Sequence, residues 1–144
     1  MNKKMRIEQT PDSEFRTEYD PTTDEFRTTA YRCRSFEYGC EGYYGWLVDT
    51  GTPPEPHLDM LLLSDEKYNI GDIVMCKIIG YFRRNDADHK LLGIEPSSTI
   101  NDISELQPEV LKSLQRLYSG KYEGEAWIGR KGAEQAYLSF VDKK

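Results

Sequence analysis

A single acidic residue, Asp59, enters an apolar run directly behind three prolines, and this is the most informative pattern in the 144-residue chain. The run occupies residues 53–63 and reads PPEPHLDMLLL. Several carboxylates that converge on divalent cations can lower the pKa of a bound water, and cationic groups beside them can neutralise a departing phosphate. No single local motif of this chain supplies such a set. Separate strands must therefore assemble it, and their polar faces are candidates for lining a shared cavity.

Residues 7–88 read as short strands separated by Gly, Pro and Asp, a pattern typical of a barrel or sandwich. Residues 15–20 alternate in polarity, which places Arg16, Glu18 and Asp20 on one face of a strand. Residues 60–63 are almost continuously apolar, as expected for a strand that is buried on both faces. The extended segments that we predict are residues 15–20, 25–36, 43–48, 60–63, 73–82 and 90–94.

The loop at residues 83–89 is expected to join the last two of these strands as a hairpin. Its basic pair, Arg83 and Arg84, is predicted to be a solvated hairpin end rather than a ligand clamp. The tyrosines at positions 38, 43 and 44 and Trp46 could form a platform for stacking bases, but packing between strands is the better account of these rings.

After residue 100 the pattern changes to a helical period. Gln107 with Pro108 at the first helical position predicts a helix that ends before Gly120 and carries an apolar stripe. Residues 131–141 are expected to form a second, shorter helix. Both helices are predicted to cover the strands. The stripe of the first helix consists of Val110, Leu111, Leu114 and Leu117.

Length and composition predict one domain, residues 1–144, with a core large enough to fold without disulfides or a structural metal. The net charge of −6 argues against a dedicated nucleic-acid binder but permits a local basic pocket for a small anion. Three cysteines without metal-site spacing are expected to be reduced thiols in a cytoplasmic protein. The longest apolar run, residues 60–63, is too short to span a membrane, and no signal segment is read at the start.

Six segments, taken in order, resemble soluble (family I) inorganic pyrophosphatases, and the similarity extends over roughly residues 7–140. The resemblance implies a mainly β (α+β) fold, an OB-like five-stranded β-barrel with two C-terminal helices. It also implies magnesium-dependent hydrolysis of inorganic pyrophosphate to two phosphates by a metal-activated water, and it allows a homo-oligomer. The segments that carry it are residues 7–8, 15–20, 44–45, 53–63, 71–92 and 103–118.

The resemblance assigns roles to individual residues. Asp59 is similar to the aspartate that bridges two metals, and Tyr44 to a hydroxyl that orients an aspartate or binds phosphate; both are expected to be catalytic. Substrate binding falls to Arg16, Lys90 and Tyr118. The expected ligands of Mg²⁺ are Glu8, Glu18, Asp59, Asp86 and Asp88.

Four positions depart from the family pattern. Pro54 and Pro56 stand where the family has a metal-binding and a water-activating aspartate, Ala30 where it has an arginine, and Ser119 where it has a lysine. On a regular strand Ala30, Arg32 and Arg34 share a face, and Arg32 is expected to bind the substrate in place of the missing arginine.

These departures leave three hypotheses. The first is the pyrophosphatase, and the second is a catalytically degenerate relative that binds a phosphorylated ligand or a protein partner, because losing a general base costs about two to four decades of rate. The third and weakest is an oligonucleotide-binding barrel, which salt-sensitive binding to single strands would reveal.

Overall fold

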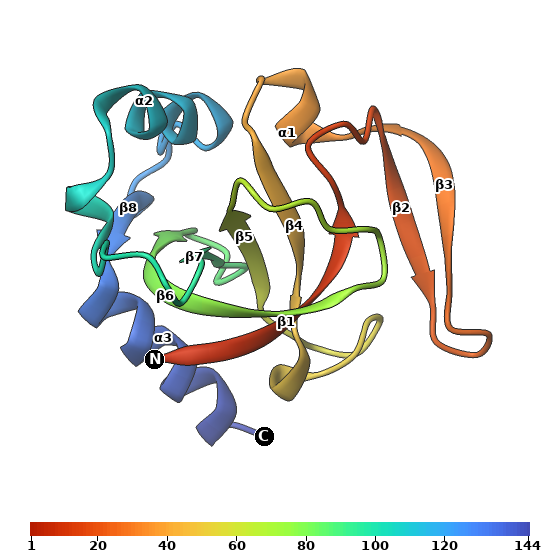
Figure 1. The fold of residues 1–144 in the computed structure, drawn as a ribbon. Helices are drawn as coiled ribbons and strands as arrows, with labels where there is room; N and C mark the ends of the chain where they lie inside the picture. The colour runs from red at the N-terminus through yellow and green to blue at the C-terminus, as the bar shows by residue number, and fades with distance from the viewer.

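The computed structural model describes residues 1–144 and shows a closed β-barrel (Figure 1). Five strands follow one another around the barrel, and pairing between the first and the last closes it. β5 and β7 are parallel and the other pairs are antiparallel. The predicted OB-like five-stranded barrel is therefore confirmed. In barrel order the strands are β1 (Asn2–Gln9), β4 (Gly42–Leu47), β5 (Asp59–Leu63), β7 (Lys90–Ile94) and β6 (Ile73–Arg83).

The apolar character of β5 follows from its contacts on two sides. Met60 and Leu62 lie in the core cluster that fills the barrel, whereas Leu61 points the other way into a second cluster. Because successive side chains of a strand point to opposite faces, a strand between two apolar layers needs apolar residues at every position. The prediction that this strand is buried on both faces is confirmed.

The two predicted C-terminal helices are present and cover different parts of the barrel (Figure 1). α2 (Pro108–Leu117) begins after Gln107 with proline in its first turn, and its stripe packs against the cluster that contains Leu61. α3 (Arg130–Asp142) buries Ala133 and Tyr137 against the barrel core. None of the helices combines the length and the hydropathy that crossing a bilayer requires.

Three short elements near the helices were not predicted, because three or four residues carry no readable period. β8 (Ala126–Gly129) pairs with the second half of β6 outside the barrel. Two single 3-10 turns, η1 (Val48–Thr50) and η2 (Ile103–Glu105), follow β4 and precede α2.

The remaining strands, β2 (Phe15–Asp20) and β3 (Glu25–Arg32), form a separate two-stranded ribbon beside the barrel (Figure 1). Tyr19 attaches this ribbon, because its ring lies 4.9 Å from Phe26 and 5.1 Å from Trp46 of the barrel. The ribbon brings Arg16 and Glu18 to the mouth of the barrel.

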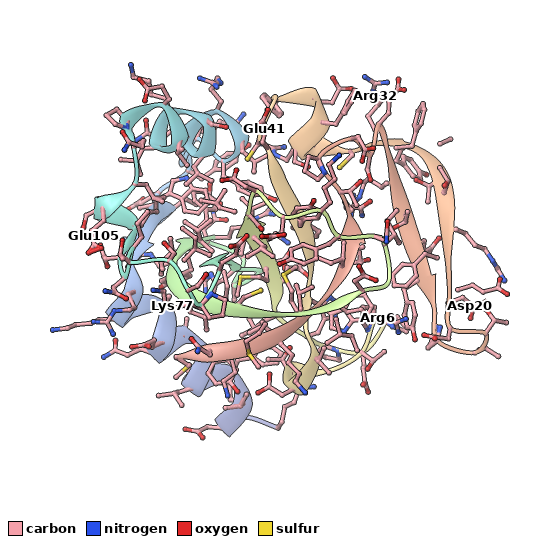
Figure 2. All side chains as sticks on the ribbon, in the orientation of Figure 1. Arg6, Asp20, Arg32, Glu41, Lys77 and Glu105 are labelled. Atoms are coloured by element: carbon pink, nitrogen blue, oxygen red, sulfur yellow. The ribbon has the colours of Figure 1, made fainter.

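Our prediction of extended structure over residues 25–36 was wrong at its C-terminal end. The chain leaves β3 after Arg32 and forms the short helix α1 (Arg34–Glu37). Cys33, just before this helix, and Ser35, within it, are both buried. Their Sγ and Oγ atoms lie 3.3 Å apart. A turn at this point buries both small side chains, which a continued strand beside solvent would expose. Arg32 projects outward at the junction (Figure 2).

All three cysteines are buried and unpaired. Burial raises the pKa of Cys76 to about 12, so this thiol is protonated at neutral pH.

Candidate functional site

Asp59 begins β5 and is held by groups from three other segments. The Oη atom of Tyr44 donates a hydrogen bond of 2.6 Å to Oδ2 of Asp59, and Nζ of Lys90 donates a second of 2.6 Å to the same oxygen. His57 places Nε2 3.0 Å from Oδ1. Both carboxylate oxygens therefore have partners within the chain.

The register of the barrel produces this group of contacts. Asp59 lies opposite Lys90 in the parallel pair β5–β7, and opposite Trp46 in the antiparallel pair β4–β5. Tyr44 lies two residues from Trp46 and so shares a face with Asp59 as its diagonal neighbour. A Cβ on the adjacent Gly45 would stand 1.8 Å from the carbonyl oxygen of Arg6, so only glycine permits β1 and β4 to approach here.

Asp59 and Lys90 form a buried ion pair. Lys90 is only 6% exposed. Burial raises the pKa of Asp59, but the hydrogen bond from His57 and the charge of Lys90 outweigh it and bring this pKa to about 2. For Lys90 burial lowers the pKa, but the charge of Asp59 more than offsets this effect, so that the pKa is raised overall. Burial and the charge of Asp59 raise the pKa of Tyr44. At neutral pH the group thus contains a carboxylate, an ammonium and a neutral phenol.

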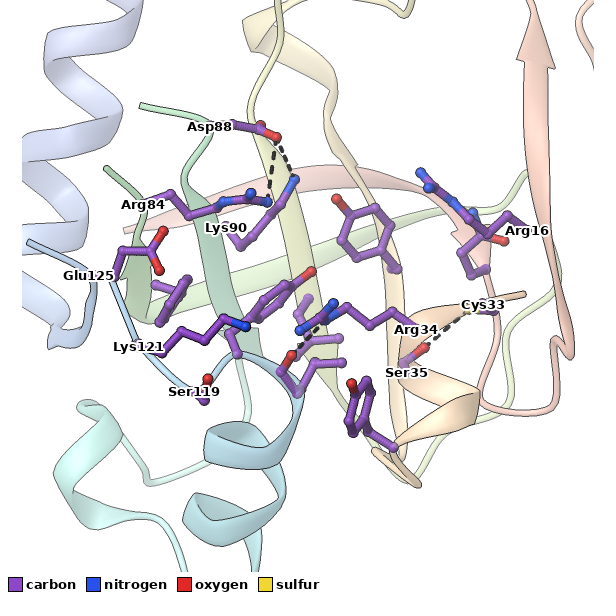
Figure 3. Close-up of a pocket in the computed structure, with 18 of the residues that line it drawn as sticks. Arg16, Cys33, Arg34, Ser35, Arg84, Asp88, Lys90, Ser119, Lys121 and Glu125 are labelled. Atoms are coloured by element: carbon purple, nitrogen blue, oxygen red, sulfur yellow. Dashed lines mark hydrogen bonds and ion pairs between the residues drawn. The ribbon is translucent and has the colours of Figure 1, made fainter. Parts of the chain in front are cut away.

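Tyr44 and Lys90 also line a cavity of about 680 Å³ (Figure 3). Six cationic side chains line it against only two carboxylates, so the cavity has a strongly basic wall inside an acidic protein. The cations are Arg16, Arg32, Arg34, Arg84, Lys90 and Lys121, and the carboxylates are Asp88 and Glu125.

The six cations differ in how far carboxylates already neutralise them. Arg32 pairs with Glu14 and Glu37. Arg84 lies 3.4 Å from Asp86 and 3.9 Å from Asp88.

Three cations form no salt bridge within the chain and project into the cavity from different segments (Figure 3). Arg16 comes from β2, Arg34 from α1 and Lys121 from the segment after α2. Arg34 is held in place because its Nε donates a hydrogen bond of 2.6 Å to the carbonyl of Leu117 and its guanidinium lies 5.1 Å from the ring of Tyr118. These are the cations that are free to bind an incoming anion.

A second cavity of about 310 Å³ adjoins the first, and Arg16 lines both. Glu8 and Glu18 line it together with Pro54. Burial, and after it the charge of Asp59, raises the pKa of Glu8 to about 7. Glu8 is therefore partly protonated at neutral pH.

The structure brings all the predicted substrate-binding residues into one cavity. Arg16, Arg32, Lys90 and Tyr118 line it together with Tyr44. Sequence reasoning missed Arg34 and Lys121. It also placed Arg84 at a solvated hairpin end, and that side chain is 33% exposed and lines the cavity. Tyr38 is 45% exposed at the cavity and is not packed between strands.

The five predicted metal ligands are divided among different places. Glu8 and Glu18 line the second cavity and Asp88 the first, whereas Asp86 is exposed beside Arg84. Nowhere in the chain do three or more His, Cys, Asp or Glu side chains form a group that could hold a metal ion.

The resemblance implies magnesium at this site, but the residues present do not fit that ion. Mg²⁺ requires several oxygen ligands in near-octahedral geometry. Asp59 has both oxygens engaged by Tyr44, Lys90 and His57, and neither Pro54 nor Pro56 has a side-chain donor. The arrangement therefore does not form a magnesium cage.

The fold and the cavity together define the chain as an OB-like barrel protein with a basic pocket at one mouth. A family model described as inorganic pyrophosphatase matches residues 5–136, and the chain therefore belongs to the inorganic pyrophosphatase family.

Relatives and solved structures agree with this assignment. The inorganic pyrophosphatase of Thermoplasma volcanium is 33% identical over 115 residues, which is 70% of this chain and 68% of that protein. That of Helicobacter pylori is 30% identical over 112 residues, 67% of this chain and 64% of the relative. The structure of the Thermus thermophilus inorganic pyrophosphatase superposes with a TM-score of 0.75 at 22% identity, covering 99% of this chain and 90% of the other. Identity this low shows the shared fold alone.

Proposed function

We propose that this chain binds inorganic pyrophosphate, or a comparable small diphosphate, in the basic cavity. The observation that carries this proposal is the set of three salt-bridge-free cations, Arg16, Arg34 and Lys121, that project into one cavity from separate segments. A diphosphate carries several negative charges and presents oxygens on two phosphorus atoms. Cations on opposite walls can contact both ends at once through charge-assisted hydrogen bonds.

Neutral donors complete such a site. Tyr118 lines the cavity, and burial raises the pKa of its hydroxyl, which keeps it protonated as a donor. Tyr44 is protonated for the same reason but already donates to Asp59. Membership of the inorganic pyrophosphatase family supports the choice of ligand, because its relatives are named for this compound.

Hydrolysis of the bound diphosphate is the second candidate, and Glu8 is the observation that favours it. A carboxyl group with a pKa of about 7 can accept a proton from water at neutral pH, and Glu8 lies in the cavity next to the basic one. The expected water-activating aspartate is absent, since Pro56 has no carboxylate. We therefore propose that hydrolysis is much slower than in relatives with the complete set.

Two measurements separate these candidates. Calorimetric titration with methylenediphosphonate, a diphosphate analogue that is not hydrolysed, measures binding alone. Release of phosphate from pyrophosphate in the presence of magnesium measures turnover. Saturable binding with phosphate release no faster than in a protein-free blank supports the binding function. Robust release that Asp59→Asn abolishes would establish hydrolysis in its place.

A further inference from the structure

Asp59 is the carboxylate that the family resemblance places between two metals, and in this chain other groups use its lone pairs. A carboxylate offers about four lone-pair positions. Tyr44 and Lys90 use two on Oδ2, and His57 uses one on Oδ1. A metal ion could bind here with more than one oxygen only after displacing at least one of these groups.

Displacing Lys90 is unfavourable because of where it lies. The residue is 6% exposed and makes ion pairs of 2.6 Å with Asp59 and 3.2 Å with Asp88. A divalent cation bound to Asp59 would compete with Lys90 for its closer carboxylate partner. It would also place a second positive charge beside the buried ammonium of Lys90. The site therefore disfavours the second positive charge.

The two aspartates of the loop before Lys90 are also neutralised by basic side chains of this chain. Arg84 lies between Asp86 and Asp88, at 3.4 Å and 3.9 Å. Asp88 also accepts from Lys90 (Figure 3). The negative charges that would otherwise require a metal are thus balanced by side chains of this chain, while Arg16, Arg34 and Lys121 retain net positive charge toward the cavity.

We propose that Lys90, seated on Asp59, takes over the charge-neutralising role of a divalent cation, so that the cavity binds its diphosphate ligand without metal. This inference rests on the proposed function. It adds that the ligand is bound as the free anion, by side chains alone, and not as a magnesium complex.

Calorimetric titration of methylenediphosphonate into the wild-type protein, once with a chelator and once with excess magnesium, tests the inference. The heat that magnesium and the ligand produce when they form a complex is measured in a titration without protein and subtracted. We expect Kd values that agree within about threefold, a difference of roughly 0.65 kcal/mol. Binding that occurs only with magnesium, or that magnesium tightens by about tenfold or more, would overturn the inference and leave the proposed function standing. Absence of binding in both buffers would overturn the proposed function as well.

Substitution of Lys90 adds a second arm. Lys90→Met frees Asp59, so we expect binding in chelator to weaken by roughly tenfold or more and magnesium to restore part of it. The matched control is Lys121→Met, which removes a cation of the same cavity that does not contact Asp59; its loss of affinity should be equal in the two buffers. A Lys90→Met protein that responds to magnesium no more than Lys121→Met would contradict the proposed role of Lys90.

A third arm does not depend on the folding of a variant. Magnesium alone, titrated into the wild-type protein, should produce no saturable heat. Saturable binding of magnesium would show that the protein holds a metal ion without the ligand, and would overturn the inference.

Discussion

The Nζ atom of Lys90 lies 2.6 Å from Oδ2 of Asp59, across the parallel pair of strands β5 and β7. This contact fixes the charge pattern of the site, because it makes a largely buried carboxylate one half of an ion pair. The other half, Lys90, is almost fully buried as well. The pair is therefore a structural element of the site as well as a source of charge.

Breaking this pair should destabilise the protein strongly. Asp59→Asn leaves the ammonium of Lys90 buried with only Asp88 as a counter-charge, and we expect a loss of about 3–5 kcal/mol in the free energy of unfolding. Urea denaturation followed by circular dichroism measures this. The control is Asp86→Asn, an exposed carboxylate, which should leave the midpoint unchanged. Equal midpoints for wild type and Asp59→Asn would show that the ion pair contributes nothing to stability.

The two arginines that flank Cys33 should differ in their contribution to binding, although both line the cavity. Arg32 is already paired with Glu14 and Glu37, whereas Arg34 has no carboxylate partner. We expect Arg34→Met to weaken binding of methylenediphosphonate by roughly tenfold, and Arg32→Met by no more than about threefold. Isothermal titration calorimetry at one ionic strength compares them. The reverse order would mean that Arg32 is the cation that binds the ligand, as we predicted from the sequence.

Glu8 should make stability depend on pH. Its pKa is about 7 in the folded protein, above the value of about 4.3 expected for an unfolded chain. The folded state therefore binds the proton more tightly, and the stability from this group is complete below about pH 4 and is lost as the pH rises through about 7.

Glu8→Gln removes this dependence. We expect the variant to be more stable than wild type at about pH 8, by at most about 4 kcal/mol, and the two to converge as the pH falls toward about 4. Thermal unfolding of both proteins across this range measures the difference. A constant gap between the two curves would show that Glu8 titrates in the folded protein as it does in the unfolded chain.

Leu61 offers a test of the layered core. It is 1% exposed and belongs to the cluster beneath α2, so Leu61→Ala should cost about 2–5 kcal/mol in the free energy of unfolding. Chemical denaturation checks the value, with Val48→Ala, an exposed apolar residue, as the control. If the two variants lose similar stability, α2 does not pack on β5 as described.

Local pattern was sufficient for strands β2 to β7 and for the two C-terminal helices, but it did not predict β1, whose pairing with β6 closes the barrel. Three signals depend only on the element itself or on the elements packed against it. They are the alternation at residues 15–20, the apolar run at 60–63 and the proline at the start of α2. The position of Arg34 could not be predicted in this way. It depends on the turn after Arg32, which follows from burial of Cys33 and Ser35 and not from any helical period.

The central ion pair was beyond sequence reasoning for a different reason. Asp59 and Lys90 are 31 residues apart, and only the parallel pairing of β5 with β7 sets the register that places them opposite each other. His57 is only two residues from Asp59, and its Nε2 lies 3.0 Å from Oδ1 of that residue. Lys121 lies in an irregular segment, where no periodicity indicates which way a side chain points.

The most direct test of the account is a calorimetric titration of methylenediphosphonate into the wild-type protein and into the variant that combines Arg16→Met, Arg34→Met and Lys121→Met. All three side chains line the cavity without forming a salt bridge, so their loss should leave the folded structure intact while removing the charge that attracts the anion. The account predicts one saturable site in the wild-type protein and no detectable binding in the triple variant. Unchanged affinity in a folded triple variant would contradict it, as would a wild-type protein that does not bind the diphosphonate.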